Sequence, residues 1–474
     1  MTLRFKNSLG NSVQEFSPIT EGEVRMYTCG PTVYDYAHIG NFRTYMFEDL
    51  LRRWLKYRGY KVIQVMNLTD VDDKTIRESR KAGLSIEEYT KKYKDAFFED
   101  LDTLGIERAE HYPAATQHVP QMVKLVSRLL EAGVGYRGGD DSIYFAIDKF
   151  PGYGKLSGKD IEKNISGARI DSDEYEKDQA ADFALWKAWS ESDGEVFWET
   201  ELGKGRPGWH IECSAMSMEY LGESFDIHTG GEDNLFPHHE NEIAQAEAAT
   251  GKKFVNFWLH SAHLIVDGKK MSKSLGNFYT LRQLLDKGFD PLAIRYVLLA
   301  THYRSQLNFT LEGLRGAETS VERLAEFRAM LRELPEGEKG GAKEILDNAR
   351  DKFESCLDDD LNISGALGAV FEMVREVNKL RDSGDIAADD ASPILDFLED
   401  FHAVTGLLPE KEESAEVPVI LNGEEISIEE AIEMRAKARS EKDWETADAL
   451  RDAIADAGYI LKDTPEGTLW RRSD

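Results

Sequence analysis

One stretch near the start of the chain constrains the fold more than any other, because it has the pattern of a strand, a helix and a second strand in succession. Residues 24–29 form a short strand-like run that ends at Gly30-Pro31, and residues 61–66 form a second. Between them, apolar residues recur at the spacing of one helical face: Phe47, Leu50, Leu51, Trp54 and Leu55. A strand–helix–strand unit of this length forms a right-handed crossover between parallel strands. We therefore predict an α/β fold built on a parallel sheet.

The carboxyl ends of these strands are the expected location of a ligand site, because ligands bind at that edge of open parallel sheets. Cys29 ends the first strand, Thr69 follows the second, and His38 lies in the turn that leads into the helix. These three side chains are therefore predicted to lie near one crevice. Two further strands of the sheet are predicted within 225–231 and 254–265, where apolar and aromatic residues recur.

Changes in composition divide the chain into six segments. The predicted order is the first half of the sheet domain, an irregular insertion rich in glycine turns, the second half of the sheet domain, a lysine-containing loop with the residues after it, a helical bundle and a small terminal domain. The corresponding boundaries are 1–110, 111–204, 205–265, 266–310, 311–408 and 417–474.

Helical periodicity dominates the C-terminal part of the chain. It predicts helices at 311–334, 343–357, 365–380 and 428–457. Two charged stretches marked by Gly or Pro, 335–343 and 409–416, are predicted linkers.

Charge and composition exclude several classes of protein. The net charge of −30 argues against a general binder of nucleic acid or anionic membranes, although it leaves room for local basic patches. No apolar run approaches the roughly 18 residues that cross a bilayer. The N-terminus has no signal-peptide core, and three cysteines do not make a disulfide framework. We expect a cytoplasmic protein without a membrane partner.

The turn before the first helix has the features of a phosphate site. Free N–H groups and the positive end of the helix dipole attract anions there. His38 adds a side-chain donor, and Gly40 permits close approach of a nucleotide to the backbone. A polar turn with a capping histidine is the alternative interpretation.

A second segment, residues 270–277, combines two lysines with Ser and Gly. Lys270 and Lys273 are mobile point charges of the kind that stabilise a departing polyphosphate. A solvated basic loop is the alternative here.

A third cluster has the residue types of a metal site. His238 and Glu242 are four residues apart and share a helical face, whereas His239 is predicted on a different face. Two cysteines would complete a tetrahedral Zn²⁺ site, giving the set Cys29, Cys213, His238 and Glu242. Taken alone, such residues are more often a surface ion pair and two core cysteines.

Residues 38–41 and 270–274 resemble the two signatures of class I aminoacyl-tRNA synthetases, which are known as HIGH and KMSKS. Asn41 stands in place of the second histidine, and its amide can still donate to phosphate. Longer segments resemble the cysteinyl-tRNA synthetase family nearly end to end, above all residues 27–34, 67–74, 205–216 and 236–245.

This resemblance implies a class I Rossmann-like catalytic domain with an insertion, followed by a helical bundle and a C-terminal anticodon-binding domain. Residues 266–310 would then hold the KMSKS loop and a stem-contact region. The implied reaction is ATP-dependent activation of L-cysteine to cysteinyl-adenylate and transfer to the 3′ end of tRNA(Cys). Mg²⁺ would accompany ATP, and one zinc ion per subunit would bind the substrate thiolate. We expect a monomer without an editing domain.

The resemblance also implies roles for individual residues. The catalytic ones are His38, Asn41, Lys270 and Lys273. The ATP contacts are His38, Gly40, Asn41, Gly231, Asp233 and Lys273. The cysteine contacts are Cys29, Thr69, Trp209 and His228. The zinc ligands are Cys29, Cys213, His238 and Glu242.

The terminal domain is expected to bind the anticodon end of tRNA despite the acidic chain. Trp470 offers a stacking face for an unpaired base. Cations gather nearby in the sequence: Arg435, Lys437, Arg439, Arg451, Arg471 and Arg472.

Three other functions compete with this one. An amino-acid ligase of the same fold could join cysteine to an amino sugar, but such ligases lack the family-like terminal segment at 428–472. A non-catalytic tRNA-binding relative could share the fold, and the intact lysines and metal ligands argue against it. A zinc hydrolase with Glu240 as its base would need a His-x-x-x-His pair, which is missing here.

Overall fold

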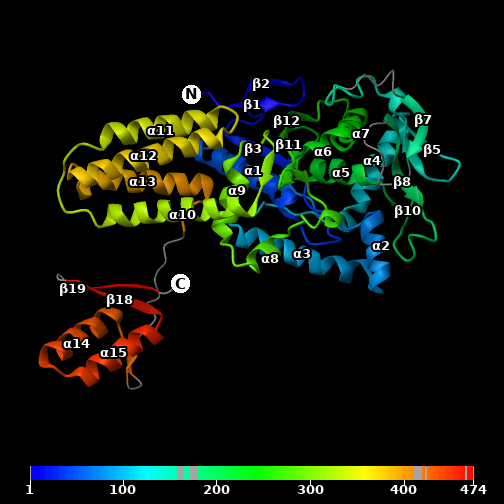
Figure 1. Cartoon of the computed structure of the whole chain (residues 1–474). Coiled ribbons are helices and arrows are strands. Elements are labelled where there is room, and N and C mark those ends of the chain that lie inside the picture. Colours follow the sequence, from blue (N-terminus) through cyan, green and yellow to red (C-terminus); the bar gives the residue numbers. More distant parts are fainter. Residues whose placement is uncertain are drawn as a thin grey trace. The chain divides into compact units, whose positions relative to one another are not determined.

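The computed structural model describes residues 2–158, 165–170, 180–409, 419–421, 424–464 and 467–472. The chain forms two compact units, Met1–Leu408 and Pro409–Asp474 (Figure 1). Among the described residues, no helix is both long enough and apolar enough to span a membrane.

A four-stranded parallel sheet forms the centre of the first unit, with the strand order β12-β11-β3-β4. Its strands are β3 (Glu23–Thr28), β4 (Lys61–Met66), β11 (Phe225–Gly231) and β12 (Val255–Ser261). Helix α1 (Ile39–Tyr57) connects β3 to its parallel neighbour β4. The predicted α/β fold on a parallel sheet is therefore confirmed.

Side chains of the central strands alternate between two cores, as the pleat requires when both faces are covered. Met26 and Val62 pack on the side of α1, in the core that continues into the helical bundle. Tyr27 and Val65 pack on the opposite side, against Ile211 and its neighbours on helix α5 (Trp209–Leu221). Helix α7 (Glu240–Thr250) contributes to this second core.

The segment between the two halves of the sheet is more regular than the sequence analysis predicted. It contains η1 (Ala115–Gln117), α4 (Val119–Glu131) and η2 (Ile147–Lys149). It also contains β5 (Gly135–Arg137), β6 (Ile143–Phe145), β7 (Ile165–Ile170), β8 (Ala180–Ala188), β9 (Trp198–Thr200) and β10 (Gly203–Pro207). These strands form one sheet, in the order β5-β6-β8-β10-β9 with β7 beside β8. The prediction of an irregular insertion was therefore wrong. Several of these strands have only three residues, which is too short for a strand pattern to be recognised in the sequence.

The lysine segment lies in a small sheet of its own, with the order β14-β13-β15. Its strands are β13 (Leu264–Val266), β14 (Lys269–Lys270) and β15 (Leu307–Phe309). Between them lie η5 (Lys273–Leu275), α8 (Leu281–Leu285) and α9 (Pro291–Ala300). The other elements described in this unit are β1 (Arg4–Asn7), β2 (Ser12–Glu15), α2 (Asp73–Ala82), α3 (Ile86–Thr103), α6 (Glu232–Asn234) and η4 (Leu235–His239).

Four long helices run side by side at one end of the first unit (Figure 1). They are α10 (Leu311–Arg332), α11 (Lys343–Asp358), α12 (Ile363–Ser383) and α13 (Ala388–Thr405). The first three confirm predicted helices. The sequence analysis missed α13, whose interior contains Pro393, a residue that disfavours a helix interior.

Helix α1 joins the sheet to this bundle. Its buried Asp49 accepts hydrogen bonds from Arg295 of α9 at 2.5 Å and from Arg53 at 2.8 Å. Near the end of α1, the Tyr57 hydroxyl donates to Glu354 of α11 at 2.8 Å. The C-terminal half of α1 is therefore attached to α9 through Asp49 and to the bundle through Tyr57.

Within its described residues, the second unit contains two helices and two hairpins. Its elements are β16 (Val419–Leu421), β17 (Glu424–Ile426), α14 (Ile428–Glu441), α15 (Trp444–Asp456), β18 (Tyr459–Thr464) and β19 (Gly467–Arg472). The single helical stretch predicted at 428–457 is divided, because Lys442 adopts a left-handed conformation (φ 63°) and ends α14. Residues 410–416 of the predicted linker lie outside the described residues.

Candidate active site

A cavity of about 1120 Å³ opens at the carboxyl ends of the central strands. Twelve of the residues singled out from the sequence line it: Cys29, His38, Gly40, Asn41, Thr69, Trp209, Cys213, Gly231, Asp233, His238, Lys270 and Lys273. Two others, His228 and Glu242, are not among the lining residues and are fully buried. The fold thus brings together side chains that are more than 240 positions apart in the sequence, as the rule for parallel sheets leads one to expect.

The turn before α1 is held by a reciprocal pair of hydrogen bonds. The Asn41 backbone N–H donates to His38 Nδ1 at 3.2 Å, and the His38 N–H donates to Asn41 Oδ1 at 3.1 Å. Burial lowers the pKa of His38, so its ring is neutral at pH 7. A Cβ at Gly40 would lie 3.0 Å from the His38 ring and 3.3 Å from Met271. A larger residue at this position would therefore press on the His38 ring and on Met271.

The lysine loop reaches across the mouth of the same cavity. Lys273 Nζ lies 2.5 Å from Asp35 Oδ2, and this hydrogen bond raises the pKa of Lys273. Asn277 holds the loop together, accepting from the Ser272 N–H at 2.9 Å and donating to the Lys270 carbonyl at 3.2 Å. The Lys273 side chain is 66% exposed, so its ion pair is easily exchanged for another anion.

Four buried side chains at the inner end of the cavity form a possible metal site. One ligand atom from each of Cys29, His238, His239 and Glu242 lies within 4.8 Å of all the others. Cys29 Sγ is 3.2 Å from His239 Nε2, and His238 Nε2 is 3.2 Å from Glu242 Oε1. That carboxylate oxygen is buried and makes no hydrogen bond within the described part of the chain. A buried carboxylate oxygen without a hydrogen bond, beside a thiol and two imidazoles, fits a cation of the zinc type.

The prediction that His239 faces away from this cluster was wrong. His239 Nε2 lies 3.9 Å from Glu242 Oε1, because residues three apart on a helix are neighbours as well as residues four apart. The sequence analysis compared only the four-residue spacing. The three-residue spacing was the signal that would have found His239.

Cys213 of α5 lies against the same cluster, although it is outside the set of four. Its hydrogen bond with Cys29 lowers the pKa of Cys213 and raises that of Cys29. Further interactions with His238 and Tyr27 also lower the pKa of Cys213. The Cys213 thiol therefore loses its proton more readily than the Cys29 thiol.

Three more histidines hold the cluster from behind. His228 Nε2 is 3.0 Å from Glu242 Oε2, His210 Nδ1 is 2.7 Å from His238 Nδ1, and His260 Nε2 is 2.8 Å from His239 Nδ1. Burial lowers the pKa of His228 and of His260 to about 3, so both rings are neutral. His228, predicted to contact cysteine, is a hydrogen-bonding partner of Glu242 and does not line the cavity.

Glu48 of α1 is a buried residue near the site that the sequence analysis did not single out. Its Oε1 accepts a hydrogen bond from Thr229 of β11 at 2.6 Å, and its Oε2 has no partner among the described residues. Burial raises the pKa of Glu48 to about 8. The signal for it was a carboxylate between Phe47 and Leu50, on the apolar face of the predicted helix.

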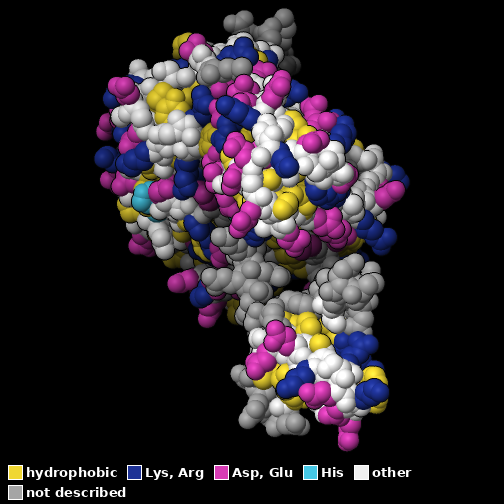
Figure 2. Space-filling model, turned by 90° about the vertical axis from the view of Figure 1, so that its left-hand side faces the viewer, with side chains coloured by type: hydrophobic (Ala, Val, Ile, Leu, Met, Phe, Trp, Pro, Cys, Tyr) yellow, Lys and Arg dark blue, Asp and Glu magenta, His cyan; other side chains and the backbone are white. Residues whose placement is uncertain are grey.

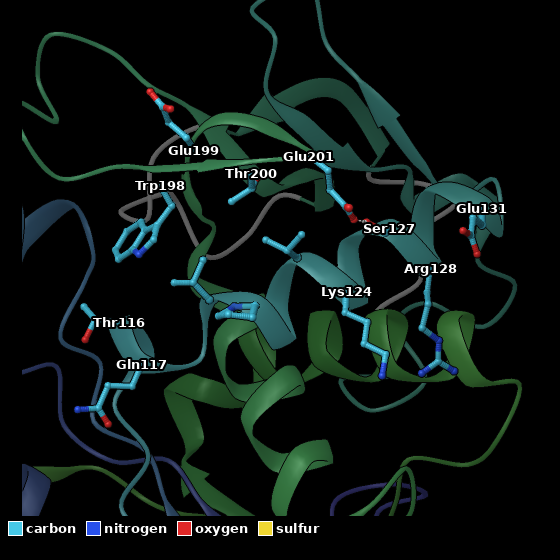
Figure 3. A pocket seen from close by; sticks show the side chains of 13 residues that line it. Thr116, Gln117, Lys124, Ser127, Arg128, Glu131, Trp198, Glu199, Thr200 and Glu201 are labelled. Carbon is cyan, nitrogen blue, oxygen red and sulfur yellow. Dashed lines mark hydrogen bonds between the residues drawn. The ribbon is translucent and has the colours of Figure 1, made fainter.

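A second cavity of about 790 Å³ lies between α4 and β9 (Figure 3). Trp198 and Lys124 contribute to its walls, and Ser127 donates to Glu201 at 2.8 Å within it. None of the site residues predicted from the sequence lines this cavity. The first cavity is therefore the candidate active site.

Comparison with known families matches three segments of the chain. Residues 15–319 match the family described as tRNA synthetases class I (C) catalytic domain. Residues 352–409 match the DALR domain, and residues 427–471 match the cysteinyl-tRNA ligase anticodon binding domain.

Curated relatives match over the whole length. The chain is 52% identical to the cysteine–tRNA ligase of Protochlamydia amoebophila, over 99% of this chain and 98% of that protein. It is 50% identical to the cysteine–tRNA ligase of Brachyspira hyodysenteriae, over 99% of both. It is 49% identical to that of Solibacter usitatus, over 100% of both.

Among solved structures, methionyl-tRNA synthetase of Mycobacterium tuberculosis in complex with methionyl-adenylate has a similar fold. The TM-score is 0.61 at 15% identity, covering 81% of this chain and 89% of that one. At this identity the likeness shows the class I fold alone. Together with the family matches and the full-length relatives, it establishes that the chain belongs to the cysteine–tRNA ligase family of class I aminoacyl-tRNA synthetases.

Proposed function

We propose that the enzyme activates L-cysteine with ATP to cysteinyl-adenylate, releases pyrophosphate, and transfers the cysteinyl group to the 3′ end of tRNA(Cys). The observation that carries this proposal is the buried Cys–His–Glu cluster, whose Cys29 and His238 line a cavity with the His38 turn and the lysine loop at its mouth. A site for a thiol and a site for a triphosphate then share one cavity.

The chain's residues fit zinc as the resident metal. Zinc held here would supply a soft Lewis acid that favours a substrate thiolate over a serine hydroxyl. We propose Cys29, Cys213, His238 and Glu242 as its ligands. His239 replaces Cys213 in the set that lies within 4.8 Å, but Cys213 lines the cavity and His239 does not. Thr69 and Trp209 line the cavity as well, and they complete the proposed pocket for cysteine.

The proposed ATP site lies on the other side of the cavity. His38 Nδ1 already accepts from the Asn41 N–H, so its Nε2 is left to donate to a phosphate. Gly40 leaves room for the nucleotide, and we propose that Gly231 and Asp233 contact the adenosine. Mg²⁺ accompanies the triphosphate. The protein acts by positioning the carboxylate of cysteine in line with the α-phosphate and by stabilising charge.

The lysine loop is proposed to act on the leaving group. In this structure Lys273 pairs with Asp35. When ATP is bound, the β- and γ-phosphates replace Asp35 as the partner, and Lys270 joins them. The positive charge then lies where negative charge develops as pyrophosphate departs.

The second unit is proposed to bind the anticodon end of tRNA. Trp444, at the start of α15, is 61% exposed, which suits stacking on an unpaired base. The side chains of Trp470, Arg471 and Arg472, predicted from the sequence for this role, lie outside the described residues. We also propose that the enzyme is a cytoplasmic monomer.

Two assays and one analysis test the proposed function on the purified enzyme. We expect cysteine-dependent exchange of pyrophosphate into ATP, charging of tRNA(Cys), and one zinc per chain. Exchange without charging would indicate a ligase for another acceptor, such as an amino sugar. The absence of both activities would indicate a non-catalytic tRNA-binding protein, and a metal-free enzyme that still rejects serine would contradict the role of zinc.

A further inference from the structure

Four tyrosines lie at the mouth of the active-site cavity and on the helix beside it. We call them the tyrosine rim: Tyr34, Tyr36, Tyr89 and Tyr93. Tyr34 and Tyr36 line the mouth of the cavity, whereas Tyr89 and Tyr93 belong to α3. The rings of Tyr36 and Tyr93 meet edge to face at 5.3 Å, and those of Tyr89 and Tyr93 are also 5.3 Å apart. The Tyr89 hydroxyl donates to the Tyr34 carbonyl at 2.9 Å. All four rings are half-buried, so each keeps part of its surface in contact with solvent.

Cationic side chains lie over the rings of this rim. Lys92 Nζ is 5.2 Å from the centroid of Tyr36 and 5.1 Å from that of Tyr93. Lys74 Nζ is 5.5 Å from Tyr34, and the Arg282 guanidinium is 5.3 Å from Tyr36. Aromatic rings interleaved with cations are the usual surface for single-stranded nucleic acid, because every base has a stacking face and every nucleotide a phosphate.

Lys92 differs from its neighbours in having no carboxylate partner. Lys91 pairs with Asp95 at 2.5 Å, and Lys94 pairs with Asp70 at 2.5 Å. Within the described chain, Lys92 makes ring contacts and no ion pair, and it is exposed. Its ammonium is therefore available to a phosphate, and its departure leaves a tyrosine face for a base.

We propose that the tyrosine rim binds the single-stranded 3′ end of tRNA, with the terminal nucleotide in the cavity and the preceding bases on Tyr36 and Tyr93. This inference rests on the proposed function and names the surface that would guide the acceptor. Continuity with the cavity favours a strand end over a duplex, whose bases are already stacked. ATP does not account for the rim, because Tyr93 and Lys92 are not among the residues that line the cavity.

The test compares two variants of the rim with a matched control. Lys92→Ala removes the cation, and Tyr93→Leu removes the stacking ring while keeping apolar volume. Lys91→Ala, one position earlier on the same helix, removes a lysine that already has a carboxylate partner. For each, the dissociation constants are measured for intact tRNA(Cys) and for tRNA(Cys) lacking its four 3′-terminal nucleotides, together with cysteine-dependent pyrophosphate exchange.

We expect Lys92→Ala and Tyr93→Leu each to weaken binding of intact tRNA by about five- to tenfold or more, as loss of one stacking or phosphate contact does. Binding of the shortened tRNA should not change, exchange should stay within about twofold, and Lys91→Ala should resemble the unaltered enzyme. The slope of log K against log salt should become shallower by about 0.7 in Lys92→Ala.

An unchanged ratio between intact and shortened tRNA in Lys92→Ala would overturn the inference. Loss of exchange in Tyr93→Leu would show that the ring holds the catalytic turn, and the lysine variant then decides alone. If the unaltered enzyme binds tRNA but does not charge it, the proposed function fails instead, and the binding comparison still decides where the 3′ end lies.

Discussion

At the scale of single residues, the candidate site depends on how each side chain is held in place. His238, His239 and Glu242 are each hydrogen-bonded to a histidine outside the cluster. The two rings and the carboxylate therefore cannot easily rotate away from the cluster. Partners of this kind orient metal ligands and raise metal affinity. Cys213 is held by the other thiol and by His238. Replacement of a proposed thiol ligand should therefore affect the binding of zinc and of cysteine specifically.

Replacing Cys213 by serine should remove zinc and weaken cysteine binding together, because a serine hydroxyl is a far poorer zinc ligand than a thiolate. ATP binding should change little, since the phosphate turn lies elsewhere in the cavity. Cys356→Ser is the matched control, because Cys356 lies on α11 outside the cavity. Metal analysis and calorimetric titration with cysteine and with ATP check this expectation. Full zinc content in Cys213→Ser would point to His239 as the fourth ligand.

Glu48 should make the stability of the enzyme depend on pH. Its pKa is raised to about 8 in the folded protein, while in the unfolded chain it is that of an ordinary carboxyl near 4.5. Between these values the folded state holds a proton that the unfolded state has lost, so the free energy of unfolding falls as pH rises. From pH 6 to pH 8 the loss should be about 2 kcal/mol.

Glu48→Gln should lack this component, because the amide keeps an acceptor for Thr229 and does not titrate. Urea unfolding of both proteins at pH 6 and at pH 8 measures the difference. Parallel changes in the two proteins would show that Glu48 is ionised in the folded state.

At the scale of elements, the sequence was most informative where structure is local. Helix α1 and its two flanking strands form one unit of adjacent segments, and their apolar spacing alone predicts them. The position of Cys29, Thr69 and His38 at one crevice followed from the rule for parallel sheets. The strands of the insertion could not be predicted in this way, because several have only three residues and the central strand β8 pairs with β6 and β10 across intervening segments. Glu48 was also missed, since its position beside the site depends on its hydrogen bond with Thr229, which is 181 positions away in the sequence.

A substitution in the lysine loop should separate the rate of adenylate formation from the affinity for ATP. Lys273→Ala should lower the rate of adenylate formation by a few-fold to about 10³-fold, because the contact strengthens as pyrophosphate departs. The affinity for ATP in the ground state and the zinc content should change little. Lys269→Ala, in β14 of the same small sheet, is the control. Rapid-quench measurement of adenylate formation checks the rate, and weaker ATP binding with a normal rate would contradict the assigned role.

At the scale of the whole molecule, the net charge of −30 opposes a general attraction to tRNA. On the face shown in Figure 2, acidic and basic side chains are interspersed. Binding must therefore come from local contacts, and it should weaken steeply as salt rises. We propose that some of these contacts belong to the second unit, which has its own small core around Val419, Ile428 and Leu450.

Removing residues 417–474 should weaken charging of tRNA while sparing cysteine-dependent exchange, because the cavity belongs entirely to the first unit. Trp444→Ala should reproduce part of the loss, by about fivefold or more in the affinity for tRNA, as expected for one stacked base. Charging kinetics and exchange, measured side by side, check both proteins. An equal fall in the two activities would mean that the second unit supports the structure of the first.

Because α1 is held by other helices toward its C-terminal end, a tilt of the helix displaces the His38 turn at its N-terminal end. Its 19 residues span about 28 Å, with His38 at one end and the contacts to Arg295 and Glu354 toward the other. Over that length a tilt of one degree displaces the end of the rod by about 0.5 Å, close to the tolerance of a catalytic group. A shift of α9 or of the bundle helix α11 would therefore tilt α1 and displace His38 at its other end.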